Sequence, residues 1–283
     1  MQITLELIKE LREKSGAGMA DCKKALQESD GDIKKAIEYL RKKGAAMATK
    51  RADKIAKEGA IKASVNSDNT SGVIIEVNCE TDFVAKGDDF QNFAQSVADT
   101  SLISGTDSLE VLLKAKGGDG LTIQENIDGM MGKVGEKIEF KRAKLINVPD
   151  GFVAFYIHFG SKVGGMVGIK GKFTEELHEI GKKMSMQVVA MNPISVKRED
   201  ISADVIEKEK EIYAIQCKNE GKPEKIIDKI IQNKVEKFYQ ENCLLEQEYI
   251  QDSSKCVGDL LKEYTRKTGE PAEVTAMVRY QLG

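Results

Sequence analysis

Residues 79–93 read CETDFVAKGDDFQNF, and the conformation of this stretch decides how the chain on either side of it is organised. It follows residues 72–77 (GVIIEV), an apolar run that is typical of a buried strand. If one helix continues through Gly87, Phe83 lies on the same face as Phe90, and periodicity alone favours this core position. If Gly87 breaks the helix, Phe83 lies at the tip of a short turn, where it is free to contact another protein.

The composition places the chain among ordinary globular proteins with more than one domain. Its 283 residues leave room for two or three domains, and the few prolines and many Lys, Glu and Ala residues favour helices over an all-β architecture. The formal charge of −3 gives no general indication of nucleic-acid binding. Without a long apolar run or a charged-then-apolar leader, we expect a cytoplasmic protein with no membrane segment. The five cysteines show no CxxC spacing, which predicts reduced thiols.

The first 43 residues carry three short amphipathic helix patterns. Thr4, Asp21 and Asp32 are the expected N-caps, and residues 15–18 (SGAG) separate the first two helices. A bundle this small is marginally stable alone, so it is typical of a docking unit attached to a larger protein. Met19 lies in the break, and we interpret it as a core residue, with adaptation to a partner surface as the alternative.

Residues 41–62 form a basic segment, in which eight Lys and Arg stand against Asp53 and Glu58. The simplest interpretation is a solvated linker or helix. The alternative is an electrostatic docking surface for RNA or an acidic protein. No aromatic residues alternate with the charges to stack on bases, which weakens the nucleic-acid alternative.

Two similar α+β units follow the basic segment. A strand, a turn, a second strand and a helix occur once within residues 60–100 and again within 142–191. The identity between the two copies is poor, so this repeat is one of architecture. The expected strands are 60–65, 72–77, 137–145, 152–158 and 164–169, and the expected helices lie near 90–97, 109–113, 123–131 and 175–191.

Residues 199–241 predict a helical hairpin, with a stop and restart at residues 221–223 (GKP). The hairpin either stabilises the core or forms an arm for a partner, and a homodimer through its apolar faces stays open. A helix at 254–264 and a strand at 271–282 are expected after it. The apolar seam of its first helix is predicted to contain Ile201, Val205, Ile212 and Ile215.

The residues that catalysis or cofactor binding would need are missing. His158 and His178 have no metal-ligand spacing around them, so neither a metal site nor a zinc centre is expected. There is no dinucleotide or phosphate-loop motif, and the glycines of residues 160–171 are better explained as a hairpin turn. We therefore expect a protein that is not an enzyme, with no catalytic residues and no cofactor, built to touch another macromolecule.

Two specific motifs resemble the signatures of the bacterial elongation factor Ts family. The first comprises residues 9–12 (KELR), 16–26 (GAGMADCKKAL) and 31–33 (GDI), and the second is residues 77–86 (VNCETDFVAK). They occur in the family's order and spacing. The likeness continues through Met191, Ser202–Lys208, the 221–223 stop and Val257–Glu263, so it covers essentially the whole chain.

The resemblance implies an α+β fold in several parts. An N-terminal three-helix module of ubiquitin-associated type, with its basic linker, would span residues 1–54. A core of two similar α+β subdomains with antiparallel strands would span 55–141 and 142–283. The hairpin at 199–241 would project from the second subdomain.

The resemblance also implies a function, that of a nucleotide exchange factor for elongation factor Tu. In that family the aromatic of the TDFV segment enters an apolar pocket near the magnesium site of this GTPase, the magnesium and phosphate contacts are disturbed, and GDP leaves. By position, the residues that bind the partner there are Thr81, Asp82, Phe83 and Val84. The docking residues elsewhere are Arg12, Met19, Lys23 and His158.

Two departures from the family pattern carry expectations of their own. Ala20 replaces a second methionine found in some members, so that docking contact is expected to be weaker. The chain ends at Gly283, where some members continue into a further helix, so that contact is expected to be absent. The competing hypotheses are an RNA- or ribosome-docking protein that uses residues 41–62, and a structural adaptor that binds without changing a partner's nucleotide affinity. The exchange-factor hypothesis predicts no direct nucleic-acid contact.

Overall fold

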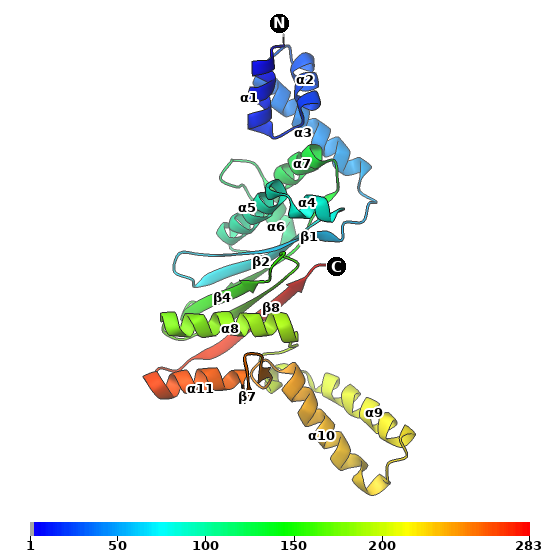
Figure 1. The fold of residues 1–283 in the computed structure, drawn as a ribbon, viewed down its shortest axis with the longest axis vertical. Coiled ribbons are helices and arrows are strands. Elements are labelled where there is room, and N and C mark those ends of the chain that lie inside the picture. The colour runs from blue at the N-terminus through cyan, green and yellow to red at the C-terminus, as the bar shows by residue number, and fades with distance from the viewer. Residues whose placement is uncertain (1–2) are drawn as a thin grey trace.

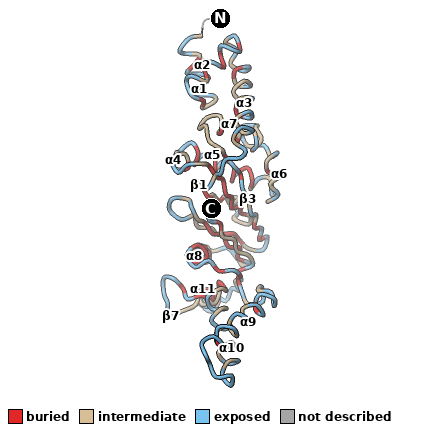
Figure 2. Tube along the Cα trace, turned by 90° about the vertical axis from the view of Figure 1, so that its right-hand side faces the viewer, coloured by how far each residue is buried: buried red, intermediate tan, exposed pale blue. Residues whose placement is uncertain are grey.

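Two three-stranded antiparallel sheets pack against each other at the centre of the computed structural model, which describes residues 3–283 (Figure 1). Helices cover the outer face of each sheet, a three-helix module lies at one end of the molecule, and a helical hairpin projects from the other. The buried residues concentrate in these central layers, whereas the hairpin is largely exposed (Figure 2). The predicted α+β fold class is confirmed.

The first sheet has the strand order β1-β2-β3, and strand alternation determines what each face contacts. Val73, Ile75 and Val77 of β2 face the covering helices, whereas Ile74, between them, faces the second sheet. The strands are β1 (Glu58–Val65), β2 (Ser71–Cys79) and β3 (Ile138–Asn147). The helices of this half are α4 (Asp82–Lys86), α5 (Asp88–Ser104), α6 (Leu109–Lys114) and α7 (Ile123–Val134).

The second sheet repeats this plan with the order β4-β5-β8. In each half a hairpin is followed by a helix that packs on it, and a later strand completes the sheet, so the predicted architectural repeat is present. The elements are β4 (Gly151–Ile157), β5 (Val163–Lys170), α8 (Glu175–Met191), α11 (Val257–Thr268) and β8 (Glu273–Gln281).

The start of the second copy differs from the prediction. Strand β3 pairs with β2 from Ile138 to Asn147, so the expected boundary between residues 141 and 142 falls inside a strand of the first sheet. The second copy begins with β4, because β4 pairs with β5 and not with the first sheet. A sequence pattern cannot distinguish these cases, since an alternating strand gives no indication of which neighbour it pairs with.

The N-terminal module contains α1 (Leu5–Ser15), α2 (Met19–Glu28) and α3 (Ile33–Lys50). Thr4 and Asp32 cap α1 and α3 as predicted, because their side chains accept hydrogen bonds from backbone N–H groups of the first turn. The predicted cap of α2 is wrong: Gly18 is its N-cap, and Asp21 lies in the first turn, paired with Lys43. Helix α3 carries the first part of the basic segment 41–62 and packs along α7.

The hairpin consists of α9 (Ala203–Asn219) and α10 (Glu224–Asn242), preceded by a short 3₁₀ turn, η1 (Arg198–Asp200). The predicted stop is present, with Gly221 in a left-handed conformation and Pro223 at the start of α10. The predicted seam of α9 is wrong by about one position. Ile206 and Cys217 are buried there, whereas Val205, Ile212 and Ile215 are exposed.

Residues 248–256 contain a small hairpin that the sequence did not predict, made of β6 (Glu248–Tyr249) and β7 (Asp252–Cys256). The helix expected from residue 254 therefore begins only at Val257. The predicted closing strand is present as β8. Throughout residues 3–283, no helix has the length and apolar character needed to cross a membrane. All five cysteines are free thiols.

Candidate functional site

The TDFV segment forms the N-terminal half of a separate one-turn helix, α4. Thr81 is its N-cap, with extended backbone and a side chain that accepts a hydrogen bond of 3.3 Å from the N–H of Val84. Gly87 ends α4 with φ −70° and ψ 139°, an extended conformation that also begins α5. The chain therefore changes direction between Phe83 and Phe90, and the two rings do not share a face.

The side chains of the tip point in different directions. Phe83 is 85% exposed, and Asp82 beside it is exposed as well. Val84 and Ala85 pack on the helical side of the first sheet, so they hold the turn in place. The position that periodicity alone favoured for Phe83, inside the core, is wrong, and the exposed tip is the conformation that forms.

The base of the tip is held by residues that lie far away in the sequence. Glu136, which follows α7, accepts hydrogen bonds from both the backbone N–H and the hydroxyl of Thr81, at 3.0 and 2.7 Å. Glu80 accepts from the backbone N–H of Lys137 at 2.6 Å and from Arg51 at 2.7 Å. Two hydrogen bonds from Thr81 to the same carboxylate restrain the orientation of Thr81. Helix α4, which Thr81 caps, therefore has a defined position on the first sheet.

The pKa values of Asp82 at the tip and of Cys79 at its base are shifted. The hydrogen bond from Lys86, at 2.7 Å, and the positive charge of Lys86 lower the pKa of Asp82, and the charge of Lys162 contributes in the same direction. Burial, together with the charges of Glu136 and Glu58, raises the pKa of the Cys79 thiol to about 12. At neutral pH, Asp82 is therefore a carboxylate, and Cys79 is a neutral thiol without nucleophilic character.

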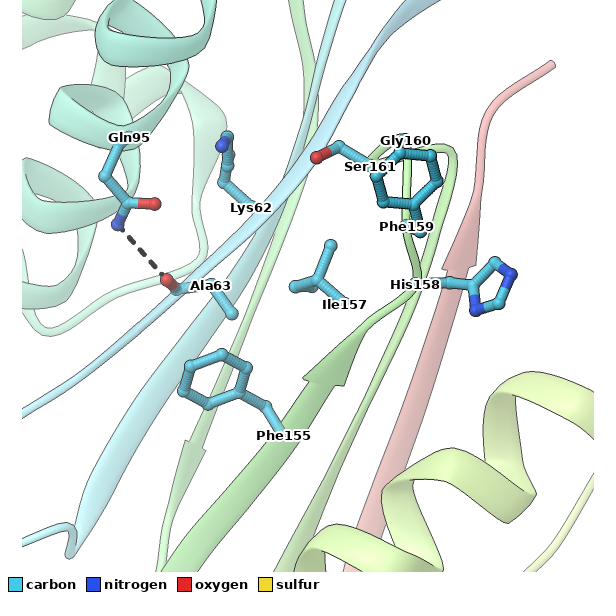
Figure 3. A pocket seen from close by; sticks show the side chains of 9 residues that line it. All are labelled: Lys62, Ala63, Gln95, Phe155, Ile157, His158, Phe159, Gly160 and Ser161. Atoms are coloured by element: carbon cyan, nitrogen blue, oxygen red, sulfur yellow. Dashed lines mark hydrogen bonds between the residues drawn. The ribbon is translucent and has the colours of Figure 1, made fainter.

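His158 lies in the turn between β4 and β5, which consists of residues 158–162 (Figure 3). Its ring is exposed, and Nδ1 lies 3.0 Å from the hydroxyl of Tyr156. The turn contacts the first sheet: Ser161 accepts a hydrogen bond of 2.7 Å from the N–H of Ile61, and Lys162 pairs with Glu58 at 2.7 Å. The antiparallel pairing of β4 with β5 confirms that the glycines of residues 160–171 belong to a hairpin.

Strand β1 connects this turn to the α4 tip. Glu58, which pairs with Lys162, lies opposite Cys79 in the β1–β2 register, and Cys79 is the last residue of β2 before the tip. The charge of Lys162 also reaches Asp82. The structure thus brings Asp82, Phe83 and His158 to one end of the two sheets.

The three residues of the N-terminal module that are predicted to dock on a partner lie elsewhere, on the surface of α1 and α2. Arg12 and Lys23 are exposed. Met19 is the first residue of α2 and is 38% exposed, so our interpretation of Met19 as a core residue is wrong. Met19 and Lys23 are four residues apart on one helix, which places them on the same face. The module forms the end of the molecule beyond the helices that surround α4 (Figure 1).

Comparison with known proteins gives a consistent result. A family model described as Elongation factor TS matches residues 80–283, which begins one residue before the tip. The chain is 49% identical to Elongation factor Ts of Chlorobium phaeobacteroides over 285 aligned residues, which cover 100% of this chain and 99% of the relative. It is 42% identical to Elongation factor Ts of Clostridium botulinum over 282 residues, covering 99% and 93%.

The chain belongs to the elongation factor Ts family. Elongation factor Ts of Prosthecochloris aestuarii is similar to the same extent, at 49% identity over 285 residues. This membership makes the chain a translation elongation factor.

Two features of this elongation factor Ts chain were missed from the sequence. Glu136 holds Thr81 from 55 positions further along the chain, and no local pattern indicates such a contact. The second feature is the 96% exposure of Phe159. The sequence contained a signal for it, since Phe159 stands directly before Gly160 in a predicted turn. Within residues 3–283, no group of three or more His, Cys, Asp or Glu side chains gathers in a way that could hold a metal ion.

Proposed function

We propose that this protein binds elongation factor Tu in its GDP-bound form and promotes GDP release by disturbing the magnesium and phosphate site of that GTPase. One observation carries the proposal: a phenylalanine that is 85% exposed projects from a tip whose base is held by Glu136. Such a side chain adds little to the stability of its own fold, whereas it gains free energy by entering an apolar pocket of a partner.

Each residue of the tip has a role in this proposal. Phe83 enters the partner's pocket, and Asp82 brings a carboxylate next to the magnesium and phosphate groups. Thr81 and Val84 shape the turn that presents them. The protein itself makes and breaks no covalent bond, so it acts as an exchange factor and not as an enzyme, in the cytoplasm where translation takes place.

The free energy needed for nucleotide exchange is larger than the tip alone can supply. Exchange is a coupling between two ligands of the GTPase, so the factor must prefer the nucleotide-free form by the same free energy by which it weakens GDP. A coupling of about 10⁴-fold corresponds to about 5.5 kcal/mol. Burial of one Phe contributes about 1.5–3 kcal/mol. Loss of magnesium contacts must supply the rest of the coupling, and docking through Arg12, Met19, Lys23 and His158 supplies the affinity that holds Phe83 in place.

The test is the release of fluorescent GDP from elongation factor Tu, followed by stopped-flow fluorescence with and without this protein. We expect the wild type to accelerate GDP release strongly. The Phe83→Ala variant should still bind measurably, but GDP release should be much slower with it. Ile103→Ala is the matched control, because Ile103 is 86% exposed but lies at the opposite end of α5 from the tip. Release that is equally fast with Phe83→Ala would show that the ring does not act on the nucleotide site.

The structure weakens the alternative of an RNA- or ribosome-docking protein. Arg41, Lys43 and Arg51, three of the basic residues in the segment 41–62, form ion pairs with Glu125, Asp21 and Glu80 of the chain itself. Their charges are therefore partly neutralised. Salt still distinguishes the two hypotheses, because RNA binding falls steeply with salt concentration, whereas stimulation of GDP release should not. A homodimer through the hairpin stays a prediction, and the exposed Ile212 and Ile215 are compatible with it.

A further inference from the structure

Among residues 3–283, Phe159 is the most exposed large apolar side chain, at 96%, so its ring makes almost no contact with the rest of the fold. It occupies the corner of the β4–β5 turn, in which the N–H of Ser161 donates to the carbonyl of His158 at 2.9 Å. Gly160 follows with φ 84°, a left-handed conformation that glycine adopts without strain. The Phe159 side chain at this corner is directed into solvent.

The turn that carries Phe159 is fixed on three sides. Ile61 of β1 donates to Ser161 at 2.7 Å, Lys162 pairs with Glu58 at 2.7 Å, and Leu282, just after β8, donates to the carbonyl of Lys162 at 3.0 Å. The ring is therefore presented to solvent from a backbone that both sheets hold. Little further ordering of the backbone is needed when a partner covers the ring, which favours binding.

A hollow of about 530 Å³ lies beside the ring, between α5 and the turn (Figure 3). Ala63, Phe155 and Ile157 supply an apolar lining on the side of the strands, and the Gln95 side chain donates to the carbonyl of Ala63 at 3.2 Å. A partner surface that covers Phe159 has room to enter this hollow and to bury apolar area there as well.

The turn and the α4 tip are connected through strand β1. Glu58 links them, because it pairs with Lys162 of the turn and lies opposite Cys79, from which the tip begins. The pKa of Asp82 is lowered first by Lys86, and Lys162 contributes to the same shift, so the turn lies within electrostatic reach of the tip. A protein that receives Phe83 is thereby brought next to Phe159.

We propose that Phe159 is a second apolar anchor of the docking face, which enters an apolar pocket of the same GTPase partner apart from the one that receives Phe83. This inference rests on the proposed function. Phe159 is attached to the end of a sheet, whereas Phe83 stands beside the carboxylate that acts on the nucleotide site. Phe159 therefore contributes binding energy that is equal before and during GDP release, which changes affinity and leaves the maximal release rate unchanged.

The experiment measures the rate of GDP release from elongation factor Tu against the concentration of wild type, Phe159→Ala, Phe159→Leu, Phe83→Ala and Ile103→Ala. For Phe159→Ala we expect the half-saturating concentration to rise about tenfold to a hundredfold, the factor that corresponds to burial of one Phe. Its maximal rate should match the wild type, and Phe159→Leu should recover most of the affinity. Phe83→Ala should instead lower the maximal rate, and Ile103→Ala should change neither.

The outcomes separate the two proposals. If the wild type does not accelerate release, the proposed exchange function fails. If the wild type and Phe83→Ala behave as described while Phe159→Ala matches Ile103→Ala, only the second anchor is overturned. The same holds if Phe159→Ala changes self-association in sedimentation velocity but not the release curve, since the ring would then bind a second copy of this chain. Equal melting temperatures of Phe159→Ala and wild type are expected, because the ring is exposed.

Discussion

Phe83 contributes almost nothing to the stability of the fold, because its ring is exposed, whereas Phe90 is buried against the first sheet. We predict that Phe83→Ala changes the free energy of unfolding by less than about 0.5 kcal/mol, as for other surface substitutions. Phe90→Ala should lower it by about 3–5 kcal/mol, since it leaves a cavity. Urea denaturation followed by far-UV circular dichroism measures both. A loss for Phe83→Ala as large as that for Phe90→Ala would mean that the ring packs against the protein in solution.

A substitution of Asp82 distinguishes a structural role of its carboxylate from a functional one. The hydrogen bond and the charge of Lys86 lower its pKa in the folded protein, so the pair adds stability above the ordinary value of 3.8, and this stability is lost as the pH falls through the lowered pKa. Because both side chains are exposed, the contribution is small. We therefore predict that Asp82→Asn melts at the wild-type temperature at neutral pH and yet slows GDP release. A sharp drop in melting temperature with unchanged release would assign the carboxylate a structural role.

The exposure of Phe83 shows what periodicity in a sequence leaves undetermined. The spacing between Phe83 and Phe90 fits one helical face, and only the extended backbone at Gly87 separates the two rings. Gly87 made a break conceivable, but the contact that holds the tip comes from Glu136, far along the chain. The family motif favoured the exposed tip that forms, whereas the physical reason for its position required the tertiary structure.

At the scale of elements, helices α3 and α7 cross where neither carries a side chain. A Cβ added to Gly44 would lie 2.3 Å from the carbonyl oxygen of Asp128, and Gly132 faces Gly44 from the other helix. This close approach attaches the N-terminal module to the first sheet's helices, and the ion pair between Arg41 and Glu125 lies on the same two helices. The module is therefore held by packing, and not only by its linker.

We predict that Gly44→Ala lowers the free energy of unfolding by about 1–3 kcal/mol, because the backbone of α7 must move to admit a methyl group. Gly129→Ala on α7 is the control: nothing lies within 4 Å of its added Cβ, so it should stabilise the helix by about 0.5–1 kcal/mol. Thermal and urea denaturation measure both variants. If Gly44→Ala proves as stable as the wild type, α3 and α7 do not cross this closely in solution.

The positions of helix caps and stops could be predicted from neighbouring residues in the sequence. Which face of a helix is buried could not. The caps at Thr4 and Asp32 and the stop at residues 221–223 could be predicted because each depends on a few neighbouring residues. In α9, apolar residues occupy two adjacent faces, and the sequence does not indicate that Ile206 is buried and Val205 is not. The β6–β7 hairpin is too short for alternation to show, which is why the helix at Val257 was predicted to begin too early.

At the scale of the whole molecule, the two sheets are joined by an apolar layer and by one buried charge. Ile61, Ile74, Val153 and Met166 are among the buried residues between the sheets. Glu76 of β2 lies in the same layer with its side chain fully buried. Arg142 on β3 is the residue that connects this carboxylate to the second sheet.

Arg142 contacts Glu76 within the first sheet and two residues of β8 in the second sheet. Its Nε donates to Glu76 at 2.6 Å, another guanidinium nitrogen donates to the carbonyl of Gln281 at 3.0 Å, and its central carbon lies 4.0 Å from the centre of the Tyr280 ring. Lys141 also donates to Glu76, at 3.2 Å. Burial of a carboxylate is costly unless charged partners surround it, so removal of Arg142 leaves Glu76 only partly compensated.

We predict that Arg142→Ala lowers the free energy of unfolding by about 3 kcal/mol, the lower end of the range for breaking a buried pair, because Lys141 remains beside Glu76. In a Glu76→Gln background the same substitution should cost much less, since no buried charge is then left unpaired. Guanidinium denaturation of the two single variants and the double variant gives the coupling energy directly. The wild type should unfold in one transition by both near-UV and far-UV circular dichroism, because the buried pair and the apolar layer make the two sheets one cooperative unit. Additive losses in the double variant would mean that Arg142 acts through Tyr280 and Gln281 alone, and the two sheets would then be joined by packing without help from the buried charge.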